Sequence, residues 1–248
     1  MLRRRHIAFF AYLLQNRTDY PREVFLLQQI DPSPCPEAGE EGLTPMPGKA
    51  GIHCLTIIGQ VEGHQSLGST SKATQYEHIL PQLAAVEESP HIGGLLVLLN
   101  TVGGDVEAGL AIAELIAGMS KPTAALVLGG SHSIGVPIAV AARRTFIAPT
   151  GTMVLHPVRI TGTVLGVPQT ADYFRRVQGR IETFVTTHSR IAPEQLRRLM
   201  QRTDQLADDI GSVVTGSEAV ELGLCDAVGT LRDALGALHE MMEVQSDV

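Results

Sequence analysis

The sequence has no tryptophan, few aromatic residues and no excess of basic charge. Aromatic side chains make up 4% of the 248 residues, and the formal net charge is −7 at neutral pH. An acidic chain is not expected to take a polyanion as its main partner. The scarcity of aromatic rings argues against platforms on which nucleic-acid bases could stack. We therefore expect no nucleic-acid partner.

Cysteine is also scarce. The three cysteines, Cys35, Cys54 and Cys225, are odd in number and far apart in the chain. They fit neither a disulfide framework nor a zinc site with paired ligands. We therefore expect no metal and no cofactor, and a reducing, cytoplasmic location is the simplest interpretation.

Long apolar runs are missing as well. The sequence MLRRRHIAFFAYLLQNR combines a basic stretch with an apolar run over residues 7–14. That run is too short to span a bilayer, and no small-residue cleavage site follows it. We expect no integral membrane span, while an amphipathic segment that touches a membrane stays open as an alternative.

Residues 31–50, DPSPCPEAGEEGLTPMPGKA, differ in composition from the rest of the chain. The segment has five prolines, three glycines and four acidic residues. It has too few apolar side chains to offset the entropy lost on ordering. The sequence predicts a flexible extension over residues 1–50 and a folded domain over residues 51–248.

Within the domain, short apolar runs alternate with segments of helical periodicity. The run GLLVLLN (94–100) is typical of a strand buried on both faces, which parallel sheets favour. Short loops join the segments, so we predict an α/β fold with parallel strand pairing. The predicted strands are 52–58, 94–100, 123–128, 145–148, 152–156, 212–216 and 224–228. The predicted helices are 76–87, 106–119, 134–142, 169–190, one from Pro193, 217–223 and 230–243.

Two of the predicted strand-to-helix turns have the same character. GLLVLLN leads into TVGGDV, and TAALVLG leads into GSHSIG, which contains Ser133. Ligands of parallel α/β sheets bind beyond the carboxyl ends of strands, where helix N-termini favour negative charge. Gly103 and Gly104 would let the backbone approach a substrate closely. We therefore expect Ser133 to face the glycine turn.

A serine nucleophile needs a base and a group that orients the base. His156 ends the strand TMVLH, whereas His188 and His239 fall in helices and His132 adjoins the serine. Asp208 or Asp209 could supply the orienting carboxylate. A serine that caps a helix and a histidine with a structural role remain the simpler alternative. The residues alone leave serine hydrolase chemistry and a purely structural turn both open.

Three motifs in order resemble the ClpP-type serine peptidases. NTVGGDVEAG resembles the NSPGG-x-V-x-AG segment of that family, GSHSIGVPIAVAA its G-x-A-S-M-G-A turn, and MVLHP its M-I-H-Q-P segment. The order serine, histidine, aspartate agrees with the family, whereas α/β-hydrolases have serine, aspartate, histidine. The resemblance covers about residues 51–235.

The resemblance implies a function and a set of roles. It implies a serine-type endopeptidase that cleaves peptides or small unfolded proteins through an acyl-enzyme. Ser133 would be the nucleophile and His156 the general base, with Asp209, or its rival Asp208, orienting the histidine. The backbone N–H groups of Gly104 and Ile134 would form the oxyanion hole.

The resemblance also implies an architecture. The fold would be a spiral of βαβ units, shared with the crotonases, with a protruding strand–helix handle over about residues 162–200. Chains of this type assemble into homo-oligomeric rings. Thr101-Val102 replaces a serine-proline pair, and His156-Pro157-Val158 replaces His-Gln-Pro, so the groove and the ring contacts are expected to differ from the family pattern.

Partners and competing functions follow from the same comparison. No Walker motif is present, so any dependence on ATP would come from an AAA+ unfoldase or from secretion machinery. The acidic linker and the apolar run at 7–14 motivate a second hypothesis, a catalytically weak assembly that binds preproteins and assists their export. A third is a crotonase-like protein that binds acyl-CoA, which the serine–histidine pair in peptidase order disfavours.

Overall fold

The computed structural model describes residues 50–248, apart from 65–66, 69, 161–165, 206–209 and 247–248. Contacts within the chain group Pro45–Val248 into one unit, and this unit is described below. The predicted extension, except for Ala50, lies outside the described residues.

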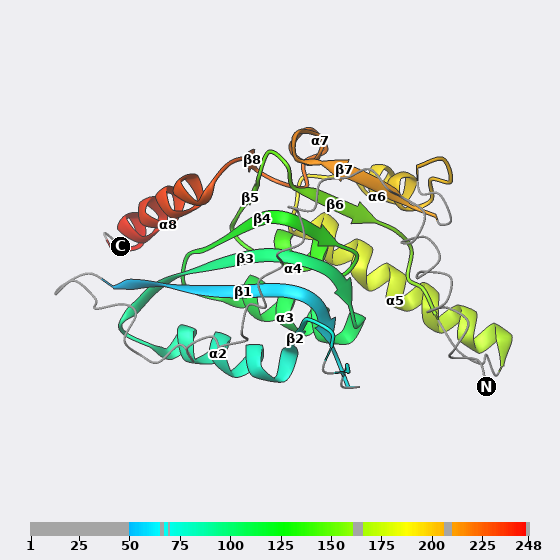
Figure 1. The fold of residues 1–248 in the computed structure, drawn as a ribbon, viewed down its shortest axis with the longest axis horizontal. Coiled ribbons are helices and arrows are strands. Elements are labelled where there is room, and N and C mark those ends of the chain that lie inside the picture. The colour runs from blue at the N-terminus through cyan, green and yellow to red at the C-terminus, as the bar shows by residue number, and fades with distance from the viewer. Residues whose placement is uncertain (1–49, 65–66, 69, 161–165, 206–209, 247–248) are drawn as a thin grey trace, which may run out of the picture. The chain divides into compact units, whose positions relative to one another are not determined.

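The unit is built on a mainly parallel sheet (Figure 1). Six strands lie in the order β2-β1-β3-β4-β5-β8, and every adjacent pair in this row is parallel. Each strand except β2 matches an apolar segment of the sequence. The strands are β1 (Gly51–Glu62), β2 (Ala73–Gln75), β3 (Ile92–Gly104), β4 (Thr123–His132), β5 (Arg144–Ile147) and β8 (Ala227–Val228).

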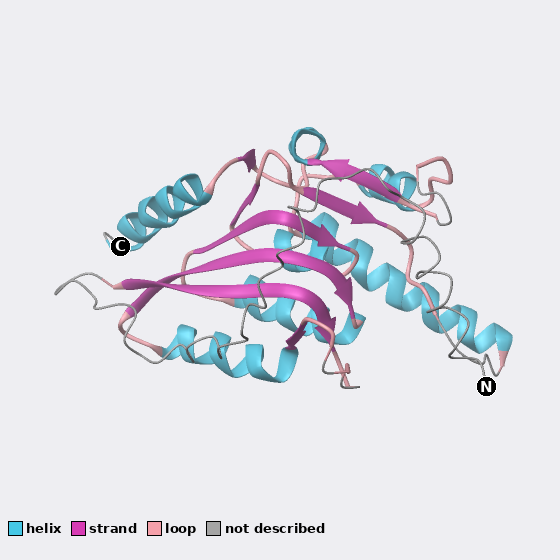
Figure 2. Cartoon of the chain, viewed as in Figure 1, coloured by secondary structure: helices cyan, strands magenta, loops and turns pink. Residues whose placement is uncertain are grey.

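Helices cover both faces of this sheet, as Figure 2 shows. Alternate residues of β3 point to opposite faces: Leu95, Val97 and Leu99 pack in the large core with the helices that follow β2, β3 and β4, whereas Leu96 packs with the last helix. Burial on both faces explains the continuous apolar run in β3. The four helices are α2 (Tyr76–Glu88), α3 (Val106–Gly118), α4 (Gly135–Val140) and α8 (Leu231–Ser246).

Strand β4 forks the sheet. Its residues 124–127 pair with β5, whereas its residues 130–132 pair with β6 (Thr152–Leu155). Strand β6 then pairs with β7 (Ser212–Thr215) in antiparallel orientation, at the end of an otherwise parallel sheet. The fork also carries β4 four residues past its predicted end, because β6 supplies a new partner beyond Leu128.

The longest helix begins away from the sheet. In α5 (Val167–Thr187) the buried residues are Val177, Ile181, Phe184 and Val185, all in its second half, and Figure 1 shows its first half extending past the strands. This is the helical part of the predicted handle. Residues 157–160 before it are in neither a helix nor a strand, and 161–165 lie outside the described residues.

Two short helices complete the unit. The helix α6 (Pro193–Met200) packs against α5 and starts with the proline that the sequence placed in its first turn. The helix α7 (Gly216–Glu221) follows β7 and begins with a capping box between Thr215 and Glu218. Within the described residues, no helix combines the length and the hydropathy that a bilayer crossing requires.

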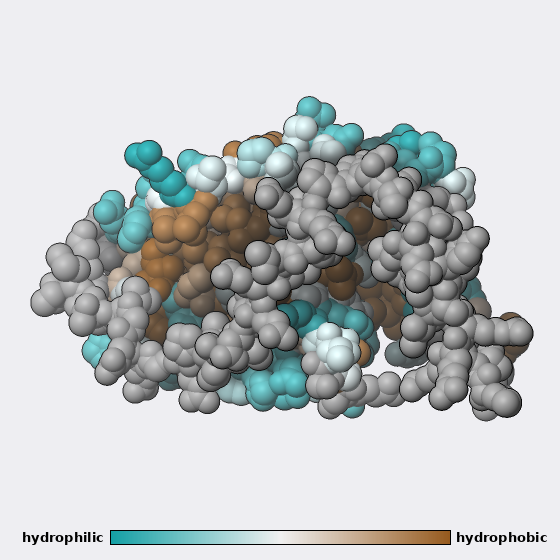
Figure 3. Space-filling view, viewed as in Figure 1, coloured by the Kyte–Doolittle hydropathy of each residue, from teal (hydrophilic) through white to brown (hydrophobic). Residues whose placement is uncertain are grey.

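Among the described residues, only α8 packs on the second face of the sheet, and it covers part of that face. Figure 3 shows apolar side chains gathered beside α8 on this face. Leu96, Leu126 and Phe146 are buried beneath the helix, whereas Ile58 and Leu128 are 48% and 44% exposed. The helix therefore protects one end of an apolar surface that continues beyond it.

Candidate functional site

The first turn of the site follows β3 and is fixed by a buried hydroxyl. Thr101 Oγ1 donates to the carbonyl oxygen of Gly59 over 2.6 Å and accepts from the backbone N–H of Gly103 over 3.0 Å. The side chain is almost fully buried, with 2% exposed. Both polar functions of the hydroxyl are therefore used to hold the backbone of the turn.

The two glycines of this turn leave no room for a side chain. A Cβ atom on Gly104 would lie 2.1 Å from the carbonyl oxygen of Val61. Gly103 has a φ of +87° and Gly104 a φ of +155°, where side chains are disfavoured. Close packing and backbone conformation both require glycine at these positions.

Ser133 sits in the second turn, directly after β4. Its φ is +56°, the one positive φ among the non-glycine residues that the structure describes. This left-handed conformation costs about 1–2 kcal/mol for a residue with a Cβ. The backbone N–H of Ser133 donates to the carbonyl oxygen of Val154 over 2.8 Å. The strained residue is thus held by the sheet.

His156 directly follows β6, and its Nδ1 has a hydrogen-bond partner among the described residues. Nδ1 lies 2.7 Å from the carbonyl oxygen of Pro157. A carbonyl oxygen only accepts hydrogen bonds, so Nδ1 carries the proton in this pair. The neutral ring then keeps a lone pair on Nε2, which is the state that a general base requires.

His132, next to Ser133, has a different role. Its Nε2 lies 3.1 Å from Thr152 Oγ1, which ties the ring to β6. Burial, and then the charge of His156, lower the pKa of His132 below its usual value. His132 is therefore held neutral close to His156, and its ring is engaged by the sheet.

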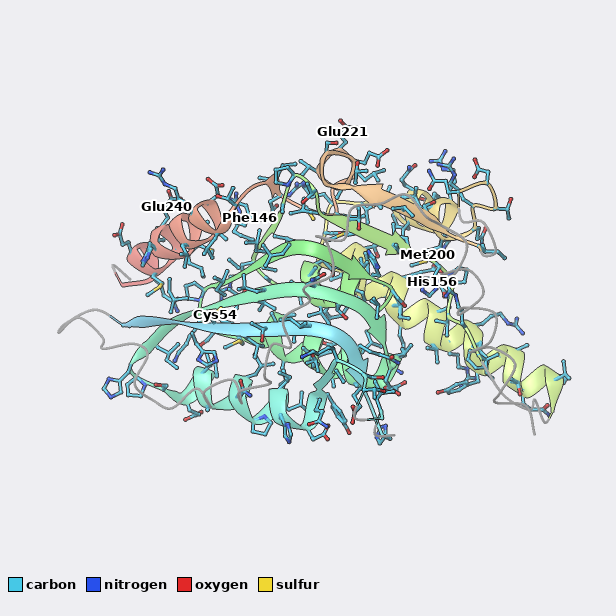
Figure 4. The ribbon with its side chains drawn as sticks, in the orientation of Figure 1. Cys54, Phe146, His156, Met200, Glu221 and Glu240 are labelled. Carbon is cyan, nitrogen blue, oxygen red and sulfur yellow. The ribbon has the colours of Figure 1, made fainter. Side chains whose placement is uncertain are left out.

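A cleft of about 360 Å³ joins these groups. The two turns form one part of its wall, and α5 supplies Ile181 and Val185 on another. Figure 4 shows His156 and Met200, both of which line the cleft, beside α5 and α6. The lining residues at the two turns and at β6 include Gly103, Gly104, Ser133, Ile134, Leu155 and His156.

An ion pair fixes α5 beside the cleft. The two terminal guanidinium nitrogens of Arg180 donate to the two carboxylate oxygens of Glu107, in the first turn of α3, over 2.6 and 3.1 Å. This hydrogen bonding lowers the pKa of the Glu107 carboxyl. The long helix is therefore attached to the same helix that follows the glycine turn.

Four of the predicted site residues lie around this one cleft: Gly104, Ser133, Ile134 and His156. Asp208 and Asp209 lie outside the described residues. Two further residues near the cleft were not predicted as site residues: Thr101, and Gln178, whose Oε1 accepts from the N–H of Val158 over 2.9 Å. Thr101 is a departure from the family motif, and Gln178 belongs to no motif. No three His, Cys, Asp or Glu side chains in the described part of the chain are grouped as a metal site would require.

Comparisons with known proteins agree with this fold. The pattern of the Clp protease family matches residues 50–232, so the chain belongs to the Clp protease family. Over 197 residues it is 56% identical to the translocation-enhancing protein TepA of Halalkalibacterium halodurans, covering 79% of this chain and 77% of that protein.

More distant relatives are proteolytic subunits. The chain is 26% identical over 136 residues to the ATP-dependent Clp protease proteolytic subunit 1 of Chlamydia muridarum, covering 54% of this chain and 69% of that one. The structure matches a mutant of ClpP1 from Listeria monocytogenes with a TM-score of 0.58 and 20% identity, covering 73% and 94% of the two chains. The last match establishes the ClpP fold, as predicted.

Proposed function

We propose that this chain is a serine-type endopeptidase in which Ser133 is the nucleophile and His156 the general base. The observation that carries the proposal is the meeting of Ser133, His156 and the glycine turn in one cleft. The strained φ of Ser133 adds support, because strained backbone gathers at functional sites. Membership of the Clp protease family points the same way.

The chemistry begins with attack of Ser133 Oγ on the carbonyl carbon of a peptide bond. The hydroxyl proton passes to Nε2 of His156, because Nδ1 already carries a proton that it donates to Pro157. The resulting imidazolium returns a proton to the leaving amine. Water then hydrolyses the acyl-enzyme by the same route, with His156 again acting as the base.

The developing negative charge on the substrate oxygen would be stabilised by the N–H groups of Gly104 and Ile134. The N–H of Ser133 already donates to Val154, which leaves the next N–H of the turn, that of Ile134, for this purpose. Loss of one such donor typically costs about 10²–10³ in rate. Their place in the wall of the cleft supports this role.

Asp209, with Asp208 as its rival, is proposed to orient the His156 ring together with the Pro157 carbonyl, and to stabilise the charged form of the ring. Strand β7 pairs antiparallel with β6 so that Ser212 lies opposite Leu155, the residue before His156. Asp209 precedes Ser212 by only three residues in the chain. The short separation in sequence between Asp209 and the residue that pairs with Leu155 supports the assignment.

The walls of the cleft favour extended peptides with apolar side chains. Val102, Val106, Ile181 and Val185 all contribute to its lining. We therefore propose peptides and small unfolded proteins as the substrates. On the first half of α5, Val167 and Tyr173 are 69% and 56% exposed, which supports burial of the handle in a homo-oligomeric ring. A cytoplasmic location, with an AAA+ unfoldase or secretion machinery as partner, belongs to the same proposal.

A fluorophosphonate probe tests the chemistry directly. Such a probe phosphonylates an activated serine, and mass spectrometry of the digested protein locates the adduct. We expect the adduct on Ser133, no labelling of Ser133→Ala, and labelling at least about 100-fold slower in His156→Gln. An unlabelled wild-type protein, or equal labelling of the alanine variant, would show that Ser133 is not an activated nucleophile.

The name of the TepA relative favours one second candidate, an assembly that binds preproteins and assists export without proteolysis. The two functions differ in their need for Ser133. In cells that lack the native gene, secretion of a reporter preprotein is measured with wild-type and Ser133→Ala protein. Normal secretion with an intact alanine oligomer favours the binding assembly, whereas lost secretion with that oligomer intact favours the peptidase.

A further inference from the structure

An unbroken series of hydrogen bonds connects His156 to α5. The carbonyl oxygen of Pro157 accepts from Nδ1 of His156 over 2.7 Å. The N–H of Val158 belongs to the same peptide group as that carbonyl, and it donates to Oε1 of Gln178 over 2.9 Å. One peptide unit therefore contacts the histidine on one side and Gln178 on the other.

The far end of the Gln178 amide is held as well. Its Nε2 donates to Oε1 of Glu182, one turn further along α5, over 2.9 Å, and lies 3.1 Å from Sδ of Met200. The second carboxylate oxygen of Glu182 accepts from Nε of Arg197 in α6 over 2.7 Å. The Glu182 side chain is only 17% exposed, so this arrangement is largely shielded from water. Gln178 therefore has little freedom to turn its amide around.

Hydrogen bonds that are connected in such a series strengthen one another. When a peptide N–H donates, electron density moves toward its carbonyl oxygen, which becomes a better acceptor. Hydrogen bonds in series gain roughly 10–30% in strength in this way. Hydrogen bonds that end on a charged group are stronger still, and here the series ends on the Glu182 carboxylate. The Pro157 carbonyl is therefore a firmer partner for His156 than an isolated peptide would be.

We propose that Gln178 is a positioning residue for His156: it holds the Pro157–Val158 peptide so that its carbonyl keeps the proton of His156 on Nδ1. In that tautomer Nε2 is the ring nitrogen that carries a lone pair. The amide is suited to this task because its oxygen accepts from Val158 while its nitrogen donates to Glu182. The catalytic consequence rests on the proposed function, whereas the control of the His156 proton does not.

Solid-state ¹⁵N NMR of protein labelled at its histidine rings reads the proton position directly, since protonated and unprotonated ring nitrogens resonate far apart. A His156→Gln sample identifies the signals of His156. Gln178→Met removes the acceptor at nearly constant length, and Gln178→Ala is a second removal variant should the methionine not fit. Gln169→Leu, at an exposed position of the same helix, is the control.

The variant Gln178→Glu/Glu182→Gln exchanges the two side chains. It keeps an acceptor for the N–H of Val158 and for Arg197, and it reverses the direction of the hydrogen bond between the two side chains. The introduced carboxylate would accept from the N–H of Val158. The introduced amide would donate to that carboxylate through its nitrogen, while its oxygen accepts from Arg197. We expect Nδ1 protonation of neutral His156 in the wild type, the control and the exchange variant. In the removal variants we expect a substantial population protonated on Nε2.

The rate of fluorophosphonate labelling provides the second readout. We expect removal of Gln178 to slow labelling by about tenfold, within the range that small misplacements of catalytic groups produce, and the exchange variant to recover most of it. An unlabelled wild type would refute the peptidase, while the NMR result would still decide the role of Gln178. Unchanged His156 signals in a folded removal variant, or loss of Nδ1 protonation in the exchange variant, would overturn the proposal.

Discussion

The two turns that frame the cleft meet at Gly103 and Ser133. A Cβ atom on Gly103 would lie 2.7 Å from Cβ of Ser133 and 3.3 Å from the backbone nitrogen of Ile134. The glycine turn therefore fixes the distance between the proposed nucleophile and the proposed oxyanion donors. Small changes in this turn should affect chemistry more than they affect the rest of the fold.

Gly103→Ala tests this contact. The alanine would have to adopt a φ of +87° and would press on the carbonyl oxygen of His132 and on Ser133. We expect fluorophosphonate labelling to fall by at least about 100-fold, as with loss of an oxyanion donor. Gly179→Ala in α5 is the control, because nothing lies near its added methyl group and alanine favours helix. Labelling of Gly103→Ala at the control rate would show that the turn tolerates a side chain.

Thr101→Val tests the buried hydroxyl. Valine has the same shape but would leave the carbonyl of Gly59 and the N–H of Gly103 without their partner. Each unsatisfied buried group costs about 1–3 kcal/mol, so for two groups we expect a free energy of unfolding lower by about 2–6 kcal/mol. Thr101→Ser keeps the hydroxyl and should lose about 1 kcal/mol, mainly for the missing methyl group. Urea denaturation measures both, and equal losses would contradict the role of the hydroxyl.

Ser133→Gly and Ser133→Ala should separate strain from chemistry. Both remove the nucleophile, but only glycine relieves the cost of a φ of +56°. We expect the glycine variant to unfold about 2–4 °C above the alanine variant, for about 1 kcal/mol of strain in a domain of this size. Differential scanning calorimetry gives both temperatures. A glycine variant less stable than the alanine variant would mean that the turn is not strained.

Stability should fall as the pH is lowered below about 6.5. Burial lowers the pKa of His53, and burial together with His156 lowers the pKa of His132. In this range the unfolded chain therefore binds more protons than the folded one, and the folded state loses stability as the pH falls from 6.5. His53 contributes because its buried Nε2 has no hydrogen-bond partner among the described residues.

The double variant His53→Leu/His132→Asn provides the comparison. We expect its melting temperature to change less between pH 7.5 and pH 5.5 than that of the wild type, measured by differential scanning fluorimetry. The same loss of stability in both proteins would assign the effect to other groups.

Most of the fold was predictable because its strands are apolar on both faces. The run Leu95–Leu99 predicted β3, and Ala124–Val127 predicted β4, since each residue there packs in one of the two cores. Strand β2 was missed because it has only three residues, ATQ. Its position depends on a distant contact instead: Thr74 Oγ1 exchanges hydrogen bonds with the N–H and carbonyl of Ile58, both over 2.9 Å.

The candidate site was predictable where it depends on local motifs. Gly104, Ser133 and His156 each fall at a strand end, and the pairing of the strands brings these ends together. Gln178 was not predictable, because its importance comes from a contact with Val158, twenty residues away and on another element. A polar residue in an amphipathic helix has no pattern that distinguishes such a contact from solvent exposure. The placement of Asp209 stays a prediction.

The fork in β4 divides substitutions in the sheet into two groups with different expected effects. The first half of β4 pairs with β5, which pairs in turn with β8. The second half pairs with β6, which pairs in turn with β7. Substitutions in β5 or β8 act on a branch that lacks His156, and should lower abundance while leaving the surviving molecules normally reactive. Substitutions at the less buried positions of β6 or β7 act on the branch that positions His156, and should yield abundant but unreactive protein. A screen that scores abundance and probe labelling together would sort mutants by the branch in which they fall.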